Sequence, residues 1–147
     1  LGGYLLQDRD QLSFDINNCE IVTKLKPETN QINALELGWK LVKYVKSNAI
    51  VFANDNQILA TGAGQMSRVD SVKNAIRKIS ETGLSLKGAI MASDAFFPFP
   101  DCIEIAAKAG IKSIIQPGGS IKDSDAIDVA DDLGLSMLFT KARHFYH

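Results

Sequence analysis

The stretch AIMASDAFFPFPDCIEIAAKAGIKSIIQPGGS, residues 89–120, decides the fold class. It opens with a short apolar run at residues 89–93 and closes with another at residues 113–115, followed by a glycine turn. We expect a helix over residues 102–109 between these runs. Two buried strands joined by a helical crossover are typical of neighbouring parallel strands. The stretch therefore predicts an α/β protein.

The same alternation continues on both sides of this stretch. A glycine loop at residues 62–66 precedes a predicted helix over residues 67–80, and a predicted helix over residues 124–133 precedes a strand at residues 135–139. Helices that alternate with strands cover both faces of a sheet. We therefore expect one three-layer α/β/α domain, residues 1–147, with a mixed, partly parallel sheet.

The first half of the chain predicts a helix and a hairpin. Apolar residues at spacings of three and four indicate a helix over residues 28–46. Two extended runs follow, at residues 49–53 and 57–61, and the polar turn Asn54-Asp55-Asn56 between them favours an antiparallel hairpin. Residues 1–26 are irregular, and we expect them to be peripheral.

Composition limits the classes of function. The chain has 147 residues, 46% of them hydrophobic, and 16 Lys and Arg against 17 Asp and Glu. This balance argues against binding nucleic acid by bulk charge and against a polybasic membrane anchor. Cys19 and Cys102 form no disulfide framework, so we expect a cytoplasmic protein. Because the chain opens at Leu1 and not at Met, we expect a fragment of a longer protein.

Loops at the carboxyl ends of parallel strands gather at one edge of the sheet, where α/β proteins bind ligands. The loop beginning at Gly62 and Gly64 leads into a helix whose first turn contains Arg68, an arrangement that favours an anion. A dinucleotide fingerprint is excluded, since Ser67 occupies the place of its third glycine. The alternative is that these glycines only form a turn.

Three phenylalanines, Phe96, Phe97 and Phe99, lie in one loop between Asp94 and Asp101. They form either a buried plug or planar surfaces for a flat heteroaromatic ligand, and the sequence leaves both interpretations open.

Two histidines, His144 and His147, lie near the end of the chain without the further ligands that zinc requires. We expect no zinc, and a tail that docks through Phe145 and Tyr146.

Five separated strings resemble one family. They are Lys46-Ser47-Asn48-Ala49-Ile50, Gly62-Ala63-Gly64-Gln65-Met66-Ser67-Arg68-Val69, Ser93-Asp94-Ala95-Phe96-Phe97-Pro98-Phe99, Gln116-Pro117-Gly118-Gly119-Ser120-Ile121 and Arg143-His144-Phe145. Together they resemble the carboxyl-terminal part of the bifunctional purine-biosynthesis enzymes, AICAR transformylase/IMP cyclohydrolase.

The resemblance implies that this chain is the second of two cytidine-deaminase-like lobes of the transformylase region. That region transfers a formyl group from 10-formyltetrahydrofolate, a folate co-substrate, to AICAR. A cyclohydrolase domain, absent here, then closes the ring to IMP. The Lys-His pair assigned to proton transfer belongs to the first lobe, so the chain alone is expected to be inactive. Transformylase sites form between subunits, which implies a homodimer.

Site residues follow from the matched positions. For AICAR, the resemblance implies contacts from Asn48, Arg68, Phe96 and Arg143, with an orienting role for Asn48. For folate, it implies contacts from Val69, Asp101, Ser120 and Ile121. Asp94 matches a residue associated with a structural potassium ion in some members, and Pro100 replaces a common arginine.

Two alternatives to the catalytic interpretation stay open. In the first, the chain is a non-catalytic α/β module that binds a nucleotide or folate. In the second, it is a purely structural lobe.

Overall fold

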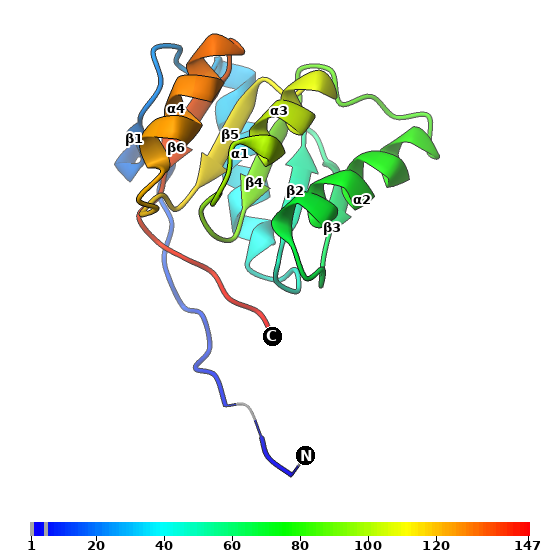
Figure 1. The fold of residues 1–147 in the computed structure, drawn as a ribbon, viewed down its shortest axis with the longest axis vertical. Coiled ribbons are helices and arrows are strands. Elements are labelled where there is room, and N and C mark those ends of the chain that lie inside the picture. Colours follow the sequence, from blue (N-terminus) through cyan, green and yellow to red (C-terminus); the bar gives the residue numbers. More distant parts are fainter. Residues whose placement is uncertain (1, 5) are drawn as a thin grey trace.

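The computed structural model describes residues 2–4 and 6–147 and shows a mixed sheet flanked by helices (Figure 1). In chain order the elements are the 3-10 helix η1 (Ile16–Asn18), β1 (Glu20–Ile21), α1 (Thr29–Val42), β2 (Ile50–Ala53), β3 (Ile58–Gly62), α2 (Arg68–Ser80), β4 (Ile90–Ser93), α3 (Asp101–Lys108), β5 (Ser113–Gln116), α4 (Asp123–Asp132) and β6 (Ser136–Phe139).

The sheet has the strand order β1-β6-β5-β4-β2-β3. Strands β4, β5 and β6 run parallel, whereas β2 pairs antiparallel with both β3 and β4. The predicted hairpin is confirmed, and Asn54 stabilises its turn by accepting hydrogen bonds from the backbone N–H groups of Asn56 and Gln57. The mixed, partly parallel sheet predicted from the sequence is therefore present.

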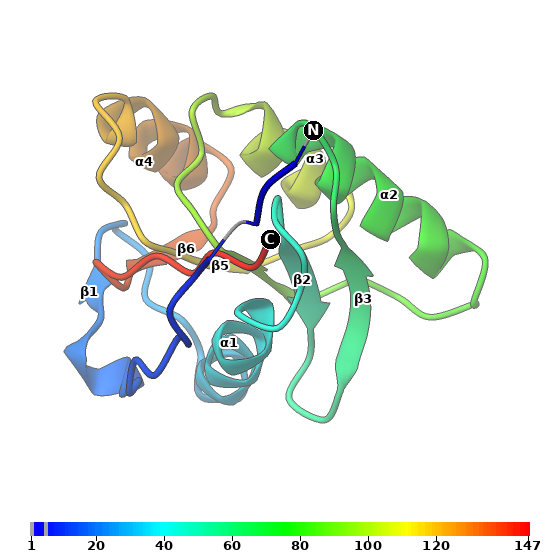
Figure 2. The same ribbon diagram turned by 90° about the horizontal axis from the view of Figure 1, so that it is seen from below.

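Helices cover both faces of the sheet, which confirms the three-layer arrangement. Figure 2 shows α1 alone on one face and α2, α3 and α4 on the other. Leu35, Trp39 and Val42 of α1 are at most 1% exposed and pack on the sheet with Val51 and Ile90. The longest helix, α1, has 14 residues, and no helix in the described part of the chain has the length and apolar character to cross a membrane.

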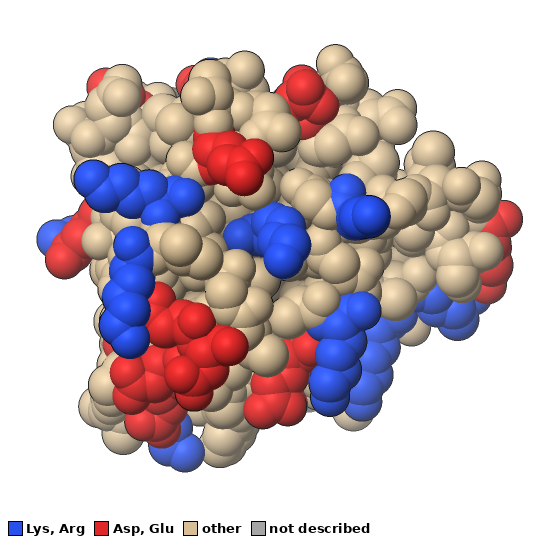
Figure 3. Space-filling view, turned by 90° about the horizontal axis from the view of Figure 1, so that it is seen from above, with Lys and Arg blue, Asp and Glu red and all other residues tan. Residues whose placement is uncertain are grey.

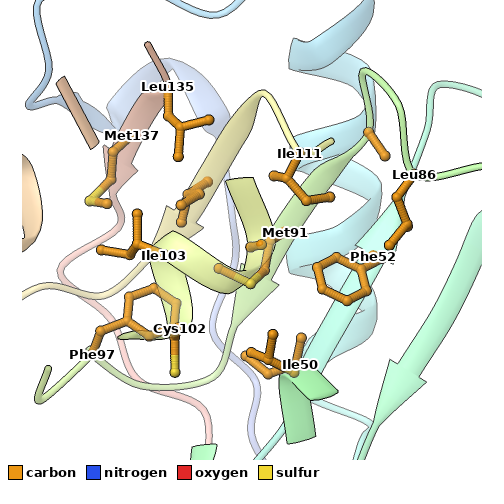
Figure 4. Close-up of a cluster of buried hydrophobic side chains, with 14 of the residues drawn as sticks. Ile50, Phe52, Leu86, Met91, Phe97, Cys102, Ile103, Ile111, Leu135 and Met137 are labelled. Carbon is orange, nitrogen blue, oxygen red and sulfur yellow. The ribbon is translucent and has the colours of Figure 1, made fainter. Parts of the chain in front are cut away.

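The larger core lies between the sheet and helices α2, α3 and α4 (Figure 4). Phe52, Met91 and Ile103 are all fully buried, and Figure 4 shows Met91 between the other two side chains. Strands β2, β4, β5 and β6 are buried on both faces, which explains why they read as continuous apolar runs.

Two features differ from the prediction. Helix α1 ends at Val42 and not at residue 46, because the N–H groups of Tyr44 and Val45 turn back to the carbonyls of Leu41 and Val42. Part of the amino-terminal segment joins the sheet, since β1 pairs antiparallel with β6. A strand of two residues carries no periodic pattern, so the sequence did not predict it.

Charged side chains of both signs are spread over the end of the molecule opposite to that seen in Figure 2. Figure 3 shows acidic groups next to basic ones on that face. On this face the two signs of charge therefore lie side by side.

Candidate functional site

A cavity of about 450 Å³ lies at the carboxyl ends of the parallel strands, where the expected loops meet. Residues from the start of α2, the phenylalanine loop, the start of α3 and the tail line it: Asn48, Met66, Ser67, Arg68, Val69, Ala95, Phe96, Pro98, Phe99, Asp101, Cys102, Arg143 and Phe145. The structure therefore brings together Arg68, Phe96 and Arg143, which are far apart in the sequence.

Arg68, at the start of α2, forms an ion pair with a buried carboxylate. Its Nη2 lies 2.9 Å from Oδ1 of Asp94, and the two side chains are only 9% and 2% exposed. Its Nη1 donates to Oδ1 of Asn48 at 2.9 Å. Burial lowers the pKa of Arg68 and the charge of Asp94 offsets only part of this effect, so the pKa is lowered overall. A guanidinium nevertheless remains protonated at neutral pH. Much of its charge is thus already balanced inside the protein.

Asn48 is fixed on three sides next to β2. Its Nδ2 donates to the backbone carbonyl of Gln65 at 3.0 Å. The backbone carbonyl of Asn48 accepts from Oγ of Ser71 at 2.7 Å. An amide side chain has two N–H donors and two acceptor lone pairs. Asn48 therefore keeps one donor and one acceptor for a ligand in the cavity.

Gly62, at the start of the glycine loop, permits close packing of α2. A Cβ at this position would lie 1.9 Å from the carbonyl oxygen of Ser71 in α2. Gly64 has a φ of +66° and so provides the turn into the helix.

The phenylalanine loop combines both interpretations left open above. Phe97 is 1% exposed and belongs to the core, whereas Phe96 and Phe99 line the cavity. The guanidinium of Arg143 lies 4.6 Å from the ring centroid of Phe96, and Nζ of Lys122 lies 4.5 Å from that of Phe99. In the described part of the chain, Arg143 has no ion-pair partner.

The start of α3 supplies a second polar group to the cavity wall. Oδ1 of Asp101 accepts the backbone N–H of Cys102 at 2.8 Å, next to Val69 in the same wall. Burial, together with the nearby Asp101, raises the pKa of Cys102 to about 12. The thiol is therefore protonated at neutral pH and is no nucleophile.

Ser120 and Ile121 lie beside the cavity and not in its wall. The side chain of Ile121 is fully exposed, and Oγ of Ser120 accepts the N–H of Lys122. The N–H of Gly119 donates to Oδ2 of Asp123 at 2.7 Å. One backbone donor of this glycine turn is thus occupied by the protein's own carboxylate.

The buried side chain of the tail is that of His144, and not that of Phe145 or Tyr146 as the sequence suggested, whereas Tyr146 is attached to Ser47 through its backbone. His144 is 3% exposed, its ring lies 4.6 Å from that of Trp39, and its Nδ1 pairs with Oδ2 of Asp10. Phe145 and Tyr146 remain 45% and 52% exposed. The imidazole is therefore a packing group.

The carboxylate of Asp94, which the resemblance associates with a potassium ion, faces groups of the protein in this arrangement. One oxygen faces Arg68, and the other accepts from Oγ of Ser47 at 2.6 Å. Both are thus within reach of donors of the protein, and the charge is balanced by a guanidinium. Ser47 itself was missed by the sequence reasoning, although it precedes Asn48 in the first matched string.

Comparisons with known proteins show the family to which the chain belongs. The family model described as AICARFT/IMPCHase bienzyme matches residues 1–78, which is more than half of the chain. The chain belongs to this bienzyme family. Proteins named bifunctional purine biosynthesis protein PurH from Aquifex aeolicus (strain VF5) and Bacillus mycoides (strain KBAB4) are 51% and 54% identical to it. Each alignment covers 99% of this chain but only 28% of the relative.

Among solved structures, this chain resembles a deaminase in fold. The dCMP deaminase of cyanophage S-TIM5 in its apo form superimposes with a TM-score of 0.52 at 22% identity, over 77% of this chain and 98% of the deaminase. At this identity the likeness concerns the fold alone. The expected cytidine-deaminase-like architecture is thereby confirmed.

Proposed function

We propose that the chain is the second lobe of an AICAR transformylase, which transfers a formyl group from 10-formyltetrahydrofolate to AICAR in cytoplasmic purine biosynthesis. It spans about 28% of the length of its curated relatives. The rest of the protein then supplies the Lys-His pair, an IMP cyclohydrolase domain and the contacts of a homodimer.

The observation that carries this proposal is the pair formed by Arg143 and Phe96 at the cavity wall. AICAR combines a planar imidazole with an anionic phosphate. An aromatic face next to a cation without a carboxylate partner suits both parts of such a molecule. The volume of about 450 Å³ is in the range of small-molecule pockets.

The reaction needs orientation more than a reactive side chain from this lobe. The 5-amino nitrogen of AICAR forms a bond to the formyl carbon, the formyl oxygen gains negative charge, and the bond to N10 of the folate then breaks. One proton passes from the amine to N10. The free N–H of Asn48 is suited to donate to the formyl oxygen, and rigid placement of the weakly nucleophilic amine lowers the barrier.

We assign the folate side to the part of the cavity wall that Val69 and Asp101 form. Val69 and Asp101 line the cavity there, and Phe99 offers a second exposed aromatic face. Ser120 and Ile121 adjoin this wall because Lys122, the next residue, contacts Phe99. Oδ1 of Asp101 is engaged by Cys102, which leaves Oδ2 to accept from a folate N–H.

A titration of the intact protein that contains this chain tests the proposal. We expect AICAR to bind in a calorimeter, Phe96→Ala to weaken that binding, and formyl transfer to require both lobes. The isolated chain is expected to show background turnover only. Binding without turnover in the intact protein would favour the non-catalytic module, and absence of AICAR binding would refute the assignment. Sedimentation of the intact protein checks the dimer.

A further inference from the structure

The carboxyl-terminal tail has no regular secondary structure, yet it carries Arg143 to the cavity. Three hydrogen bonds join its last residues to Ser47 and Asp94, besides the contact of His144 with Asp10 and the bond from Gln7 to the carbonyl of Phe145. The N–H of His144 donates to the carbonyl of Asp94 at 3.1 Å, the carbonyl of Tyr146 accepts from the N–H of Ser47 at 2.9 Å, and the N–H of Tyr146 donates to Oγ of Ser47 at 3.3 Å. The tail is thus attached to Ser47 and Asp94, which lie outside the cavity wall.

The hydroxyl of Ser47 takes part in two of the contacts that meet here. It donates to Oδ2 of Asp94 at 2.6 Å and accepts from Tyr146. The other oxygen of Asp94 faces Arg68. The hydroxyl of Ser47 therefore connects the buried ion pair with the tail, in addition to the direct bond from His144 to the backbone of Asp94.

We propose that Ser47 is a positioning residue, which couples the Arg68–Asp94 pair to the tail and so holds Arg143 over Phe96. Ser47 is not in the cavity wall and contacts no ligand there. Ser47 affects the affinity for a bound anion because it fixes the position of Arg143. The identity of that anion as AICAR rests on the proposed function, whereas the coupling itself does not.

Removal of the hydroxyl in Ser47→Ala takes away one donor and one acceptor. We expect the backbone amides of residues 143–147 to exchange hydrogen faster in the intact protein, without ligand. AICAR is expected to bind about three- to tenfold more weakly, the effect of losing one or two hydrogen bonds. Ser47→Thr keeps the hydroxyl and should restore both readouts. Ser80→Ala removes a hydroxyl that bonds the carbonyl of Arg77 on α2, and serves as the matched control.

A double-mutant cycle separates positioning from general structural damage. In an Arg143→Ala background, Ser47→Ala should cause no further loss of AICAR affinity, because the group that it positions is gone. An equal loss in both backgrounds, or unchanged exchange in the tail, overturns the inference. If the unaltered protein fails to bind AICAR, the proposed function fails, and the exchange measurement still decides whether Ser47 holds the tail.

Discussion

The guanidinium of Arg143 lies 4.6 Å from the ring centroid of Phe96, although one belongs to the tail and the other to the loop after β4. Its charge has no carboxylate partner in the described residues, whereas that of Arg68 is balanced by Asp94. A bound phosphate is therefore expected to be stabilised more by Arg143 than by Arg68. Arg143→Ala should weaken AICAR binding by about tenfold or more in calorimetry.

Arg143→Lys keeps the charge without the planar fork and should lose part of the affinity. Arg77→Ala, which removes an exposed arginine paired with Glu81, is the control. An Arg143→Ala protein with unaltered affinity would remove this residue from the site.

The buried pair of Arg68 and Asp94 predicts a large effect on stability. Asp94→Ala leaves the guanidinium of Arg68 in a site where its side chain is 9% exposed, without its anion. We expect the free energy of unfolding to fall by about 3 kcal/mol in urea titrations. Glu81→Ala breaks an exposed pair and should cost at most about 0.5 kcal/mol. Similar losses for the two variants would contradict the structure.

Gly62 permits the close approach of α2 to β3. Gly62→Ala places a methyl group 1.9 Å from a backbone oxygen of Ser71, so the helix must move. The expected loss of stability is about 2 kcal/mol or more, again measured by urea unfolding. Gly3→Ala, where nothing lies within 4 Å of the added carbon, should change stability by less than about 0.5 kcal/mol. A tolerated Gly62→Ala would show that this packing is wrong.

The contact of Asp10 with His144 predicts a dependence on pH. Burial by itself raises the pKa of Asp10, but the hydrogen bonds from His144 and from the backbone of Leu12, with the nearby charges of His144 and Lys43, together outweigh it and lower the pKa overall. A carboxyl whose pKa is lower in the folded state stabilises the fold above its unfolded pKa of about 3.9, and this contribution disappears as the pH falls through the folded value.

Asp10→Asn tests that dependence. Thermal unfolding should show the variant less stable than the unaltered protein at pH 7, with the difference shrinking below about pH 4. Asp8→Asn, a neighbouring carboxylate without an ion-pair partner in the described part of the chain, is the control. A difference that stays constant over the whole pH range would exclude the ionic contribution.

The sequence predicted those parts of the fold that depend on local patterns. Buried strands such as β4 and β5 appear as apolar runs, and the turn chemistry of Asn54 indicated the hairpin. The end of α1 at Val42 was missed because the apolar stripe continues to Val45, and only backbone hydrogen bonding shows where the helix stops.

The sequence predicted which residues form the candidate site, but not the ion pairs and hydrogen bonds that hold them. The cavity unites Asn48, Arg68, Phe96 and Arg143, as expected. Asp94 balances much of the charge of Arg68 because the start of α2 and the loop after β4 meet in space. The spacing of these residues along the chain does not predict this contact. The same holds for His144, whose partner Asp10 lies near the other end of the chain.

The course of the last residues has a practical consequence for protein engineering. His147 lies four positions beyond Arg143, and Figure 1 shows this terminus below the sheet, on the side of the loop that leads into α2. A fluorescent reporter or affinity handle fused there would crowd the mouth of the cavity. The connection between α2 and β4 lies at the far end of α2, and an alanine methyl at its Gly83 or Gly88 would meet open space. Immobilisation through that connection would leave the mouth accessible to small molecules.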